Sequence, residues 1–356
     1  MTSDPAKILL PLLTCIETLS LVARHFDPSS LGEVMEAIGT PEATLRAAYS
    51  DFKPSDASDD VGKRLVAASD EALSAFAELR EAAGQGDVRA VFRALRHLPR
   101  AQEALYPLSY VIPVVSAFFL DPSLRSDADA LARSMQPPRQ NETGVMHVDN
   151  EPRTRGGFSH YVPETYTPDR AWPLVVALHG GSGHGRGFLW NWLRDARSFG
   201  AILVAPTSAG NSLGSTWALM GDDNDTPNLA RIVAAVRERW NVDAKRLLLT
   251  GMSDGGTFCY VSALDSGSPF THLAPVSATF HPMLITMADA GRMQGLPIFL
   301  THGAQDWMFP VEVARQAQRA LSAAGANVTY REIDDLSHTY PREINAPVLD
   351  WLRTTE

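Results

Sequence analysis

The segment Arg246-Leu-Leu-Leu-Thr-Gly-Met-Ser-Asp-Gly-Gly-Thr257 decides the fold class of this 356-residue chain. Its first half is apolar and strand-like, and a second apolar run, 258–261, follows it directly. Between them lies the pattern G-x-S-x-G, which is typical of a sharp strand-to-helix turn that holds a serine hydroxyl out from a sheet. Small residues on both sides of the serine let such a strained turn pack without clashes. Ser253 is therefore predicted to be a nucleophile, and the alternative is an ordinary glycine-rich turn.

Strands and helices alternate on both sides of this turn. Buried strands are predicted at 173–178, 201–205, 246–250, 273–277, 297–301 and 328–333, with helices between most of them and an edge strand at 157–162. This alternation predicts an α/β fold, in which a mostly parallel sheet carries helices on both faces. The predicted α/β domain spans residues 141–356.

Residues 1–140 are predicted to form a helical domain that ends in a linker. Apolar residues recur at helical spacing from Ile8 to Val22, and a long amphipathic helix is predicted over 59–83. The most apolar stretch, 105–120, is interpreted as core between the two domains. Alternative interpretations are a lid over an active site, a homodimer surface, or a patch that meets lipid-like substrates. The polar segment 121–145 contains few large apolar residues and is interpreted as the linker.

Composition excludes several functional classes. A net charge of −10 argues against non-specific binding to nucleic acid or to anionic lipid. The two cysteines, Cys15 and Cys259, indicate neither a disulfide framework nor a metal site, and they favour a cytoplasmic location. The apolar run Ile8–Ile16 is too short to span a bilayer, and no clear cleavage pattern follows it, although secretion is not excluded. No stable membrane insertion is therefore expected.

Two further reactive residues follow predicted strands. Ligands of an open α/β sheet bind beyond the carboxyl ends of its strands. Asp306 follows the strand at 297–301, and His338 follows the strand at 328–333. The order serine, aspartate, histidine is one of several in which this catalytic triad occurs. His338 would take the proton of the Ser253 hydroxyl, and Asp306 would orient the imidazole and stabilise its cationic form.

Other residues compete for these two roles. The alternative bases are four histidines: His160, His184, His281 and His302. The alternative acids are two carboxylates in the same loop as His338: Asp334 and Asp335. Because they lie so near the histidine in sequence, these two carboxylates are more simply interpreted as solvated turn residues. His302 precedes a glycine at a strand end and is more simply interpreted as structural.

The tetrahedral oxyanion of acyl transfer needs fixed hydrogen-bond donors. The backbone N–H groups of Asp254 and of Gly181, in the loop after the strand at 173–178, are predicted to supply them. Aromatic, histidine and methionine side chains near the strand ends are candidates for a substrate pocket, and packing is their alternative role: Trp217, His281, Trp307 and Met308. The glycine-rich loop lacks the spacing of a dinucleotide fingerprint, and no H-E-x-x-H or C-x-x-C occurs. No cofactor and no metal are therefore expected.

Four motifs together carry a family resemblance: PLVVALHGG (173–181), TGMSDGG (250–256), THGAQDWMFP (301–310) and the final Ser337-His338. From about residue 155 onward the chain resembles the α/β-hydrolase superfamily. Within it, the motifs look most like esterases of the polyhydroxybutyrate-depolymerase-like and feruloyl-esterase-like group. They are also similar to the phospholipase/carboxylesterase group, which includes acyl-protein thioesterases.

The resemblance implies an α/β-hydrolase fold with an N-terminal helical extension, for which no resemblance is found. It also implies a serine esterase that hydrolyses small-molecule carboxylic esters through an acyl-serine intermediate, without a cofactor. A thioesterase or peptidase with the same triad is the alternative enzyme. A non-catalytic binding protein is the remaining alternative, because a fold alone does not determine a function.

Overall fold

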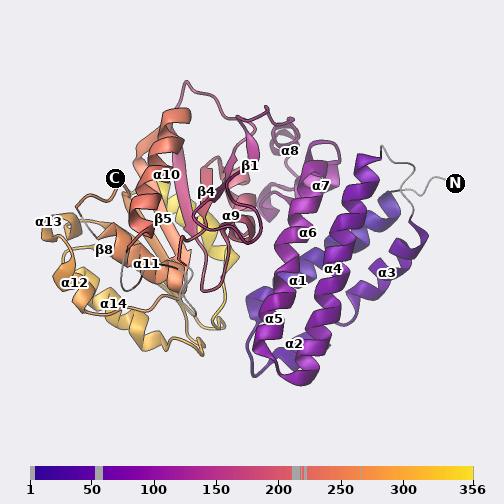
Figure 1. The fold of residues 1–356 in the computed structure, drawn as a ribbon, viewed down its shortest axis with the longest axis horizontal. Coiled ribbons are helices and arrows are strands. Elements are labelled where there is room, and N and C mark those ends of the chain that lie inside the picture. Colours follow the sequence, from indigo (N-terminus) through magenta and orange to yellow (C-terminus); the bar gives the residue numbers. More distant parts are fainter. Residues whose placement is uncertain are drawn as a thin grey trace. The chain divides into compact units, whose positions relative to one another are not determined.

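The computed structural model describes residues 5–52, 59–210, 217, 219, 223–264 and 266–355. The chain divides into two compact units, residues 1–137 and residues 138–356. Figure 1 shows the described elements of both units, coloured along the sequence.

The N-terminal unit is built from helices, in agreement with the prediction for this part of the chain. Its α-helices are α1 (Ala6–His25), α2 (Leu31–Ala37), α3 (Pro41–Asp51), α4 (Asp60–Gln85), α5 (Val88–Leu95), α6 (His97–Leu105), α7 (Pro113–Phe118) and α8 (Ala128–Ser134). Two 3₁₀ turns, η1 (Tyr106–Tyr110) and η2 (Pro122–Leu124), lie on either side of α7 in sequence.

Local capping chemistry sets the ends of α4 and the start of α5. The Asp59 carboxylate accepts a hydrogen bond from the Gly62 N–H at 2.7 Å and so caps the first turn of α4. Gly86 ends that helix in the left-handed conformation, with a φ of 66° that favours glycine. Asp87 then caps α5 by accepting from the Ala90 N–H at 3.1 Å. The predicted helix over 59–83 is therefore two residues short of the observed end.

Helix α1 is longer than the apolar run Ile8–Ile16, from which no membrane span is expected. It has 20 residues and, by length and composition, is apolar enough to cross a membrane. This corrects the expectation based on Ile8–Ile16 alone. Buried core helices and signal sequences meet the same criterion of length and composition. The buried residues of α1 recur on one side of the helix: Ile8, Leu9, Leu12, Leu13, Cys15, Ile16, Leu19 and Val22.

The second unit contains an eight-stranded sheet with the order β1-β2-β4-β3-β5-β6-β7-β8. Its strands are β1 (Gly144–Val148), β2 (Phe158–Val162), β3 (Trp172–Leu178), β4 (Ile202–Pro206), β5 (Val242–Met252), β6 (His272–Val276), β7 (Pro297–Gly303) and β8 (Asn327–Ile333). Strand β2 pairs antiparallel with both neighbours, and β3 to β8 run parallel. This is the mostly parallel sheet predicted from the alternation of elements, and its order is α/β-hydrolase-like.

Strand β1 corrects one prediction. The edge of the sheet is β1, whereas the sequence placed the edge strand at 157–162 and assigned residues up to 145 to the linker. The pairing of Gly144 with Val162 and of Val148 with Phe158 makes β2 the second strand, and all its residues are buried. Because β1 has five residues and follows a polar segment, its weak apolar signal was indistinguishable from that of a linker.

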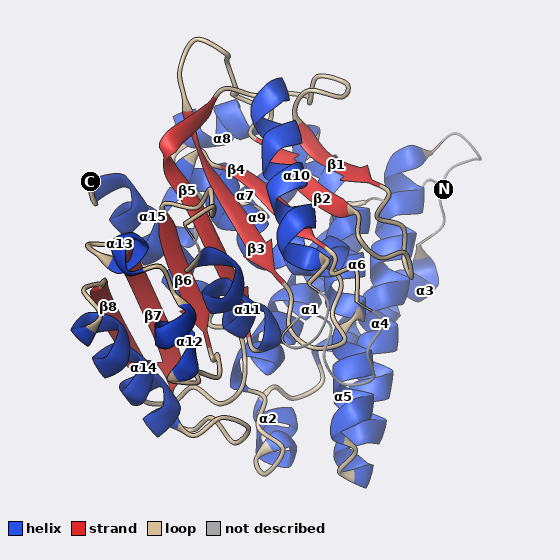
Figure 2. Cartoon of the chain, turned by 60° about the vertical axis from the view of Figure 1, so that its left-hand side comes forward, coloured by secondary structure: helices blue, strands red, loops and turns tan. Residues whose placement is uncertain are grey.

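Helices cover both faces of the sheet (Figure 2). The longer helices of this unit are α9 (Gly185–Phe199), α10 (Asp225–Arg239), α11 (Asp254–Ala263), α14 (Val311–Ala323) and α15 (Asn345–Thr354). Short helices lie at α12 (Met283–Met287), α13 (Ala290–Met293) and η3 (Arg342–Ile344).

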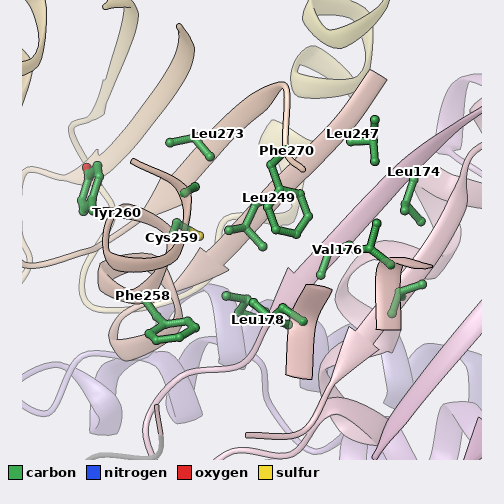
Figure 3. Packing of buried hydrophobic residues seen from close by; sticks show 14 of the residues in the cluster. Leu174, Val176, Leu178, Leu247, Leu249, Phe258, Cys259, Tyr260, Phe270 and Leu273 are labelled. Atoms are coloured by element: carbon green, nitrogen blue, oxygen red, sulfur yellow. The ribbon is translucent and has the colours of Figure 1, made fainter. Parts of the chain in front are cut away.

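Helices α10, α11 and α14 pack on one face of the sheet. Alternate residues of the central strands form one buried cluster with these three helices. Figure 3 shows this packing for side chains of β3, β5 and α11: Leu174, Val176, Leu178, Leu247, Leu249, Phe258 and Cys259. On the opposite face, Trp351 of α15 packs edge-on against Phe299 at 5.6 Å. The central strands are thus buried on both sides, as expected of a parallel sheet.

Candidate active site

Ser253 lies at the turn between β5 and α11 in a strained backbone conformation. Its φ of 55° and ψ of −120° fall in a region that L residues rarely adopt. The Ser253 N–H donates to the Val276 carbonyl at 2.9 Å, and its carbonyl accepts from the Thr257 N–H at 2.8 Å. The strain is therefore held by hydrogen bonds to β6 and to the first turn of α11.

Two glycines make this turn sterically feasible. A methyl group added at Gly251 would lie 2.6 Å from the carbonyl carbon of Gly255. A methyl group added at Gly255 would lie 2.5 Å from the His179 carbonyl oxygen at the end of β3. Both distances are far shorter than any normal contact with a Cβ atom. The glycines of the G-x-S-x-G pattern are thus explained by close approach of main chains.

The structure brings Ser253, His338 and Asp306 together in one hydrogen-bonded chain. The Ser253 Oγ lies 3.0 Å from His338 Nε2, and His338 Nδ1 lies 2.8 Å from Asp306 Oδ2. All three residues are buried. Because an ionised carboxylate only accepts hydrogen bonds, Nδ1 carries the proton and the lone pair of Nε2 faces the serine hydroxyl.

The Asp306 carboxylate is fixed by its own loop. Its Oδ1 accepts from the N–H groups of Met308 at 2.9 Å and Phe309 at 2.8 Å. Burial alone would raise the pKa of Asp306, but the hydrogen bonds from His338 and the Phe309 N–H outweigh it and hold that pKa below its usual value. The carboxylate is therefore ionised at neutral pH, as the orientation of the imidazole requires.

The competing histidines have other partners. His302 Nε2 donates to the Phe309 carbonyl at 2.8 Å and so supports the loop that carries Asp306. His184 Nε2 donates to the Thr154 carbonyl at 3.1 Å. His281 is exposed after β6, where its Nδ1 accepts from its own loop.

The remaining rivals also lie apart from the serine. His160 is buried in β2 against the rings of Phe158 and Trp240, at 5.4 and 5.2 Å between centroids. Asp334 and Asp335 are exposed in the turn after β8. Of the two readings of these carboxylates, the structure matches the solvated turn.

Two of the predicted pocket residues are open to solvent beside His338. Trp307 is 43% exposed and its ring meets the His338 imidazole edge-on at 6.2 Å. Met308, the next residue, is 40% exposed. Both follow Asp306 in the loop after β7, so they lie at the carboxyl ends of the parallel strands, as Ser253 does.

The environment of Trp217 matches its alternative role, which is packing. Its side chain is only 3% exposed, and its ring stacks on Phe258 at 5.3 Å between centroids. The indole Nε1–H donates to the His179 carbonyl at 2.7 Å. The predicted pocket wall is thus a buried support for the end of β3.

The predicted oxyanion donors lie on both sides of the nucleophile. Asp254 is the first residue of α11 and directly follows Ser253. A methyl group added at Gly180 would lie 3.6 Å from the Ser253 Cβ, which places the peptide between Gly180 and Gly181 beside the serine.

Sequence reasoning missed two residues that hold this loop. The Ser208 N–H donates to His179 Nε2 at 3.2 Å, and Arg155 Nη1 donates to the Gly183 carbonyl at 3.0 Å. Ser208 follows β4 by two residues, so the rule that sites form at carboxyl strand ends was a usable signal. Arg155 belongs to no motif and offered none.

Metal ligands do not gather within the described part of the chain: no group of three or more histidine, cysteine or acidic side chains there is placed to hold an ion. Both cysteines are buried free thiols. Burial raises the pKa of Cys15 to about 12, so this thiol is protonated at neutral pH.

Comparison with known proteins finds similarities over part of the chain. Residues 222–356 match the family model described as Phospholipase/Carboxylesterase. The bifunctional acetylxylan esterase/xylanase XynS20E of Neocallimastix patriciarum is 30% identical over 41% of this chain and 21% of its own. The probable feruloyl esterase C of Aspergillus terreus is 28% identical over 42% of this chain and 55% of its own.

These matches span about a fifth and about half of the relatives' lengths. The crystal structure of esterase PE8 is 21% identical, covers 57% of this chain and 99% of its own, and superposes with a TM-score of 0.44. The family match includes all three residues of the hydrogen-bonded chain, Ser253, Asp306 and His338. Residues 222–356 of this chain are therefore similar to the phospholipase/carboxylesterase family.

Proposed function

We propose that this protein hydrolyses carboxylic esters through an acyl intermediate on Ser253. The observation that carries the proposal is the hydrogen-bonded chain from the Ser253 hydroxyl through His338 to Asp306, with contacts of 3.0 and 2.8 Å. The alcohol of a serine is a weak nucleophile at neutral pH unless a base takes its proton. His338 is that base, and its Nε2 faces the serine hydroxyl with a lone pair that can accept the proton.

In the acylation half, His338 Nε2 takes the proton from the Ser253 Oγ while the oxygen attacks the ester carbonyl carbon. The carbonyl π bond breaks, and its electron pair moves to the oxygen, where the N–H groups of Gly181 and Asp254 stabilise the charge. The tetrahedral intermediate then re-forms its carbonyl and expels the alcohol, which takes the proton from His338. Asp306 stabilises the imidazolium throughout.

In the deacylation half, a water molecule attacks the acyl-serine carbonyl and gives its proton to His338 Nε2. Collapse of the second tetrahedral intermediate breaks the bond to Ser253, whose oxygen recovers the proton from His338. The products are one carboxylic acid and one alcohol, and the enzyme returns to its starting state. Every proton in this cycle moves through one nitrogen atom, which explains why its partner Nδ1 is fixed by Asp306.

For the substrate, we infer an ester whose acyl group reaches the surface formed by Trp307 and Met308. These two apolar side chains are exposed next to His338, and an aromatic ring favours flat or apolar acyl groups. The relatives named as acetylxylan and feruloyl esterases make acetyl and feruloyl esters the first substrates to compare.

The test is hydrolysis of p-nitrophenyl acetate and methyl ferulate by the wild-type protein and by Ser253→Ala. The wild type should hydrolyse at least one of the two and be labelled by a fluorophosphonate. Ser253→Ala should lose about 10⁴-fold or more in kcat and all labelling, because the whole triad acts through this oxygen.

Ser262→Ala is the matched control. This serine lies on the same helix and is buried, and its hydroxyl donates to the Phe258 carbonyl, so the change leaves the reacting atoms in place. It should retain activity close to wild type. A wild type that is neither active on esters nor labelled, or a Ser253→Ala variant that keeps its activity, sinks the proposal.

A further inference from the structure

The orientation of one peptide group governs the oxyanion site. The carbonyl of Gly180 and the N–H of Gly181 belong to the same planar trans peptide, and therefore point in opposite directions. Any group that fixes the Gly180 carbonyl consequently aims the Gly181 N–H. That peptide lies beside Ser253, as the approach of Gly180 to the serine Cβ shows.

Two donors hold the Gly180 carbonyl oxygen. One is the Gly183 N–H at 3.0 Å, which closes a turn over residues 180–183. The other is Nδ1 of His179, at 2.8 Å. A carbonyl oxygen only accepts, so Nδ1 must carry the proton. The Ser208 N–H donates to Nε2 of the same ring at 3.2 Å, so Nε2 must be unprotonated. The two contacts together define a single neutral tautomer.

The surroundings of His179 keep the imidazole in that state and position. Burial, with a smaller contribution from Arg155, lowers the pKa of His179 to about 3. The ring packs at a tilt against Trp217, at 4.9 Å between centroids and 38° between the ring planes. A methyl group added at Gly183 would lie 2.9 Å from His179 Nδ1, so the turn fits tightly around the hydrogen bond.

We propose that His179 is a positioning residue of the oxyanion site: its Nδ1–H holds the Gly180 carbonyl so that the Gly181 N–H faces the developing oxyanion. This proposal rests on the esterase function proposed above. His179 touches no reacting atom, so its contribution appears only where negative charge develops on the substrate oxygen. Substrate binding in the ground state depends on it little.

Two substitutions separate the hydrogen bond from the bulk of the ring. His179→Asn carries an amide N–H near the position of Nδ1 and can still donate to Gly180. His179→Gln carries its amide near the position of Nε2 and leaves the Gly180 carbonyl with one donor fewer. Both variants lose the aromatic ring, so both lose the tilted ring contact with Trp217.

The experiment measures kcat and KM for p-nitrophenyl acetate, corrected for the titrated fraction of active sites, and the affinity for a trifluoromethyl ketone that forms a tetrahedral adduct. His179→Gln should lose about 100-fold in kcat with KM within about threefold of wild type, which is the scale of one lost oxyanion donor. Its affinity for the ketone should fall by a similar factor. His179→Asn should recover at least about tenfold in both quantities.

His272→Gln is the matched control, because His272 is also buried but is the first residue of β6, at the end of that strand opposite to the serine. It should lose stability without losing kcat per titrated site. If His179→Gln keeps its kcat within threefold of wild type, or if the Asn and Gln variants lose kcat equally, the proposal for His179 is wrong while the esterase function stands. If the wild type neither hydrolyses an ester nor binds the ketone, both proposals fall.

Discussion

The site is built from two strand-to-helix turns that lie side by side but are held by different means. Strands β3 and β5 are parallel neighbours, with Leu178 paired to Gly251, so their turns meet at one edge of the sheet. The turn after β5 carries Ser253 and is held by main-chain hydrogen bonds and by glycines that let backbones touch. The turn after β3 carries Gly181 and, besides the main-chain hydrogen bond from Gly183 to Gly180, is held by side chains.

Those side chains come from separate segments of the chain. Trp217 bonds to the carbonyl of His179, and Arg155 bonds to the carbonyl of Gly183. A turn held by its own backbone needs particular residues at fixed local spacing, and so it has a sequence pattern. A turn held by distant side chains has no such pattern. This difference explains why the motif TGMSDGG predicts the turn at Ser253. The side chains that support the turn after β3 have no comparable motif.

The largest effect is expected from a substitution at the point where the turns after β3 and β5 touch. Gly255→Ala would set a methyl group 2.5 Å from the His179 carbonyl oxygen and 2.6 Å from that of Leu178. Main-chain atoms cannot rotate away, so both turns must shift. We expect a loss of more than about 3 kcal/mol in the free energy of unfolding, at the upper end of overpacking effects. Ester hydrolysis should become undetectable in the folded fraction.

Thermal unfolding and p-nitrophenyl acetate hydrolysis measure the two effects. Gly84→Ala is the control, since Gly84 lies in α4 and an added methyl group meets nothing within 4 Å. It should be neutral or slightly stabilising because alanine favours a helix. A Gly255→Ala protein with normal melting temperature and activity would show that the two turns are not in the tight contact described here.

The same distinction explains which parts of the fold were predictable. The parallel strands were predicted to within a few residues, and the long helix predicted over 59–83 is found at 60–85, because buried strands and amphipathic helices have strong local periodicity. Strand β1 was missed because its stability comes from pairing with β2, whose partner residues lie 10 to 18 positions away along the chain. The sequence of a five-residue segment gives little indication of the free energy gained when it pairs with another strand.

In the site, the residues that follow strands were predicted and those that act at a distance were not. Ser253, Asp306 and His338 were each selected by position after a strand, and the structure joins them. Trp217 was selected as an aromatic residue in a loop, but nothing local indicated that its indole N–H meets the His179 carbonyl. The contact joins residues 38 positions apart, and only the folded chain determines it.

A second change sharpens the comparison within the turn after β3 and should have a moderate effect. Gly183→Ala would bring a methyl group 2.9 Å from the Gly180 carbonyl oxygen and from His179 Nδ1. We expect about a 100-fold fall in kcat, because the hydrogen bond that aligns the oxyanion donor is disrupted. Stability should change by about 1 kcal/mol, since the turn lies at the surface.

Gly180→Ala is the matched variant, with its added methyl group at 3.5 and 3.6 Å from Met252 and Ser253, which are ordinary contact distances. Its kcat should fall less than that of Gly183→Ala. Both rates are measured with p-nitrophenyl acetate at saturating concentration. The reverse order would mean that crowding at the serine matters more than the alignment of the peptide.

The smallest expected effect concerns pH, because only the turn after β3 is held by a titratable side chain. The folded pKa of His179 is about 3, below the 6.5 of an unperturbed histidine. Between these values the unfolded chain binds a proton that the folded chain does not, so stability rises with pH and is lost as pH falls below 6.5. We expect His179 to contribute a loss of about 2 kcal/mol between pH 7 and pH 5.

Urea unfolding of the wild type and of His179→Asn at both pH values isolates this contribution. Two other buried histidines, His160 and His272, have pKa values lowered to about 4, chiefly by burial, and they titrate alike in both proteins. The difference in unfolding free energy between the proteins should therefore narrow by about 2 kcal/mol at pH 5. A constant difference would mean that the ring takes up a proton in the folded state, and the neutral tautomer that holds Gly180 would then not be the resting state in mild acid.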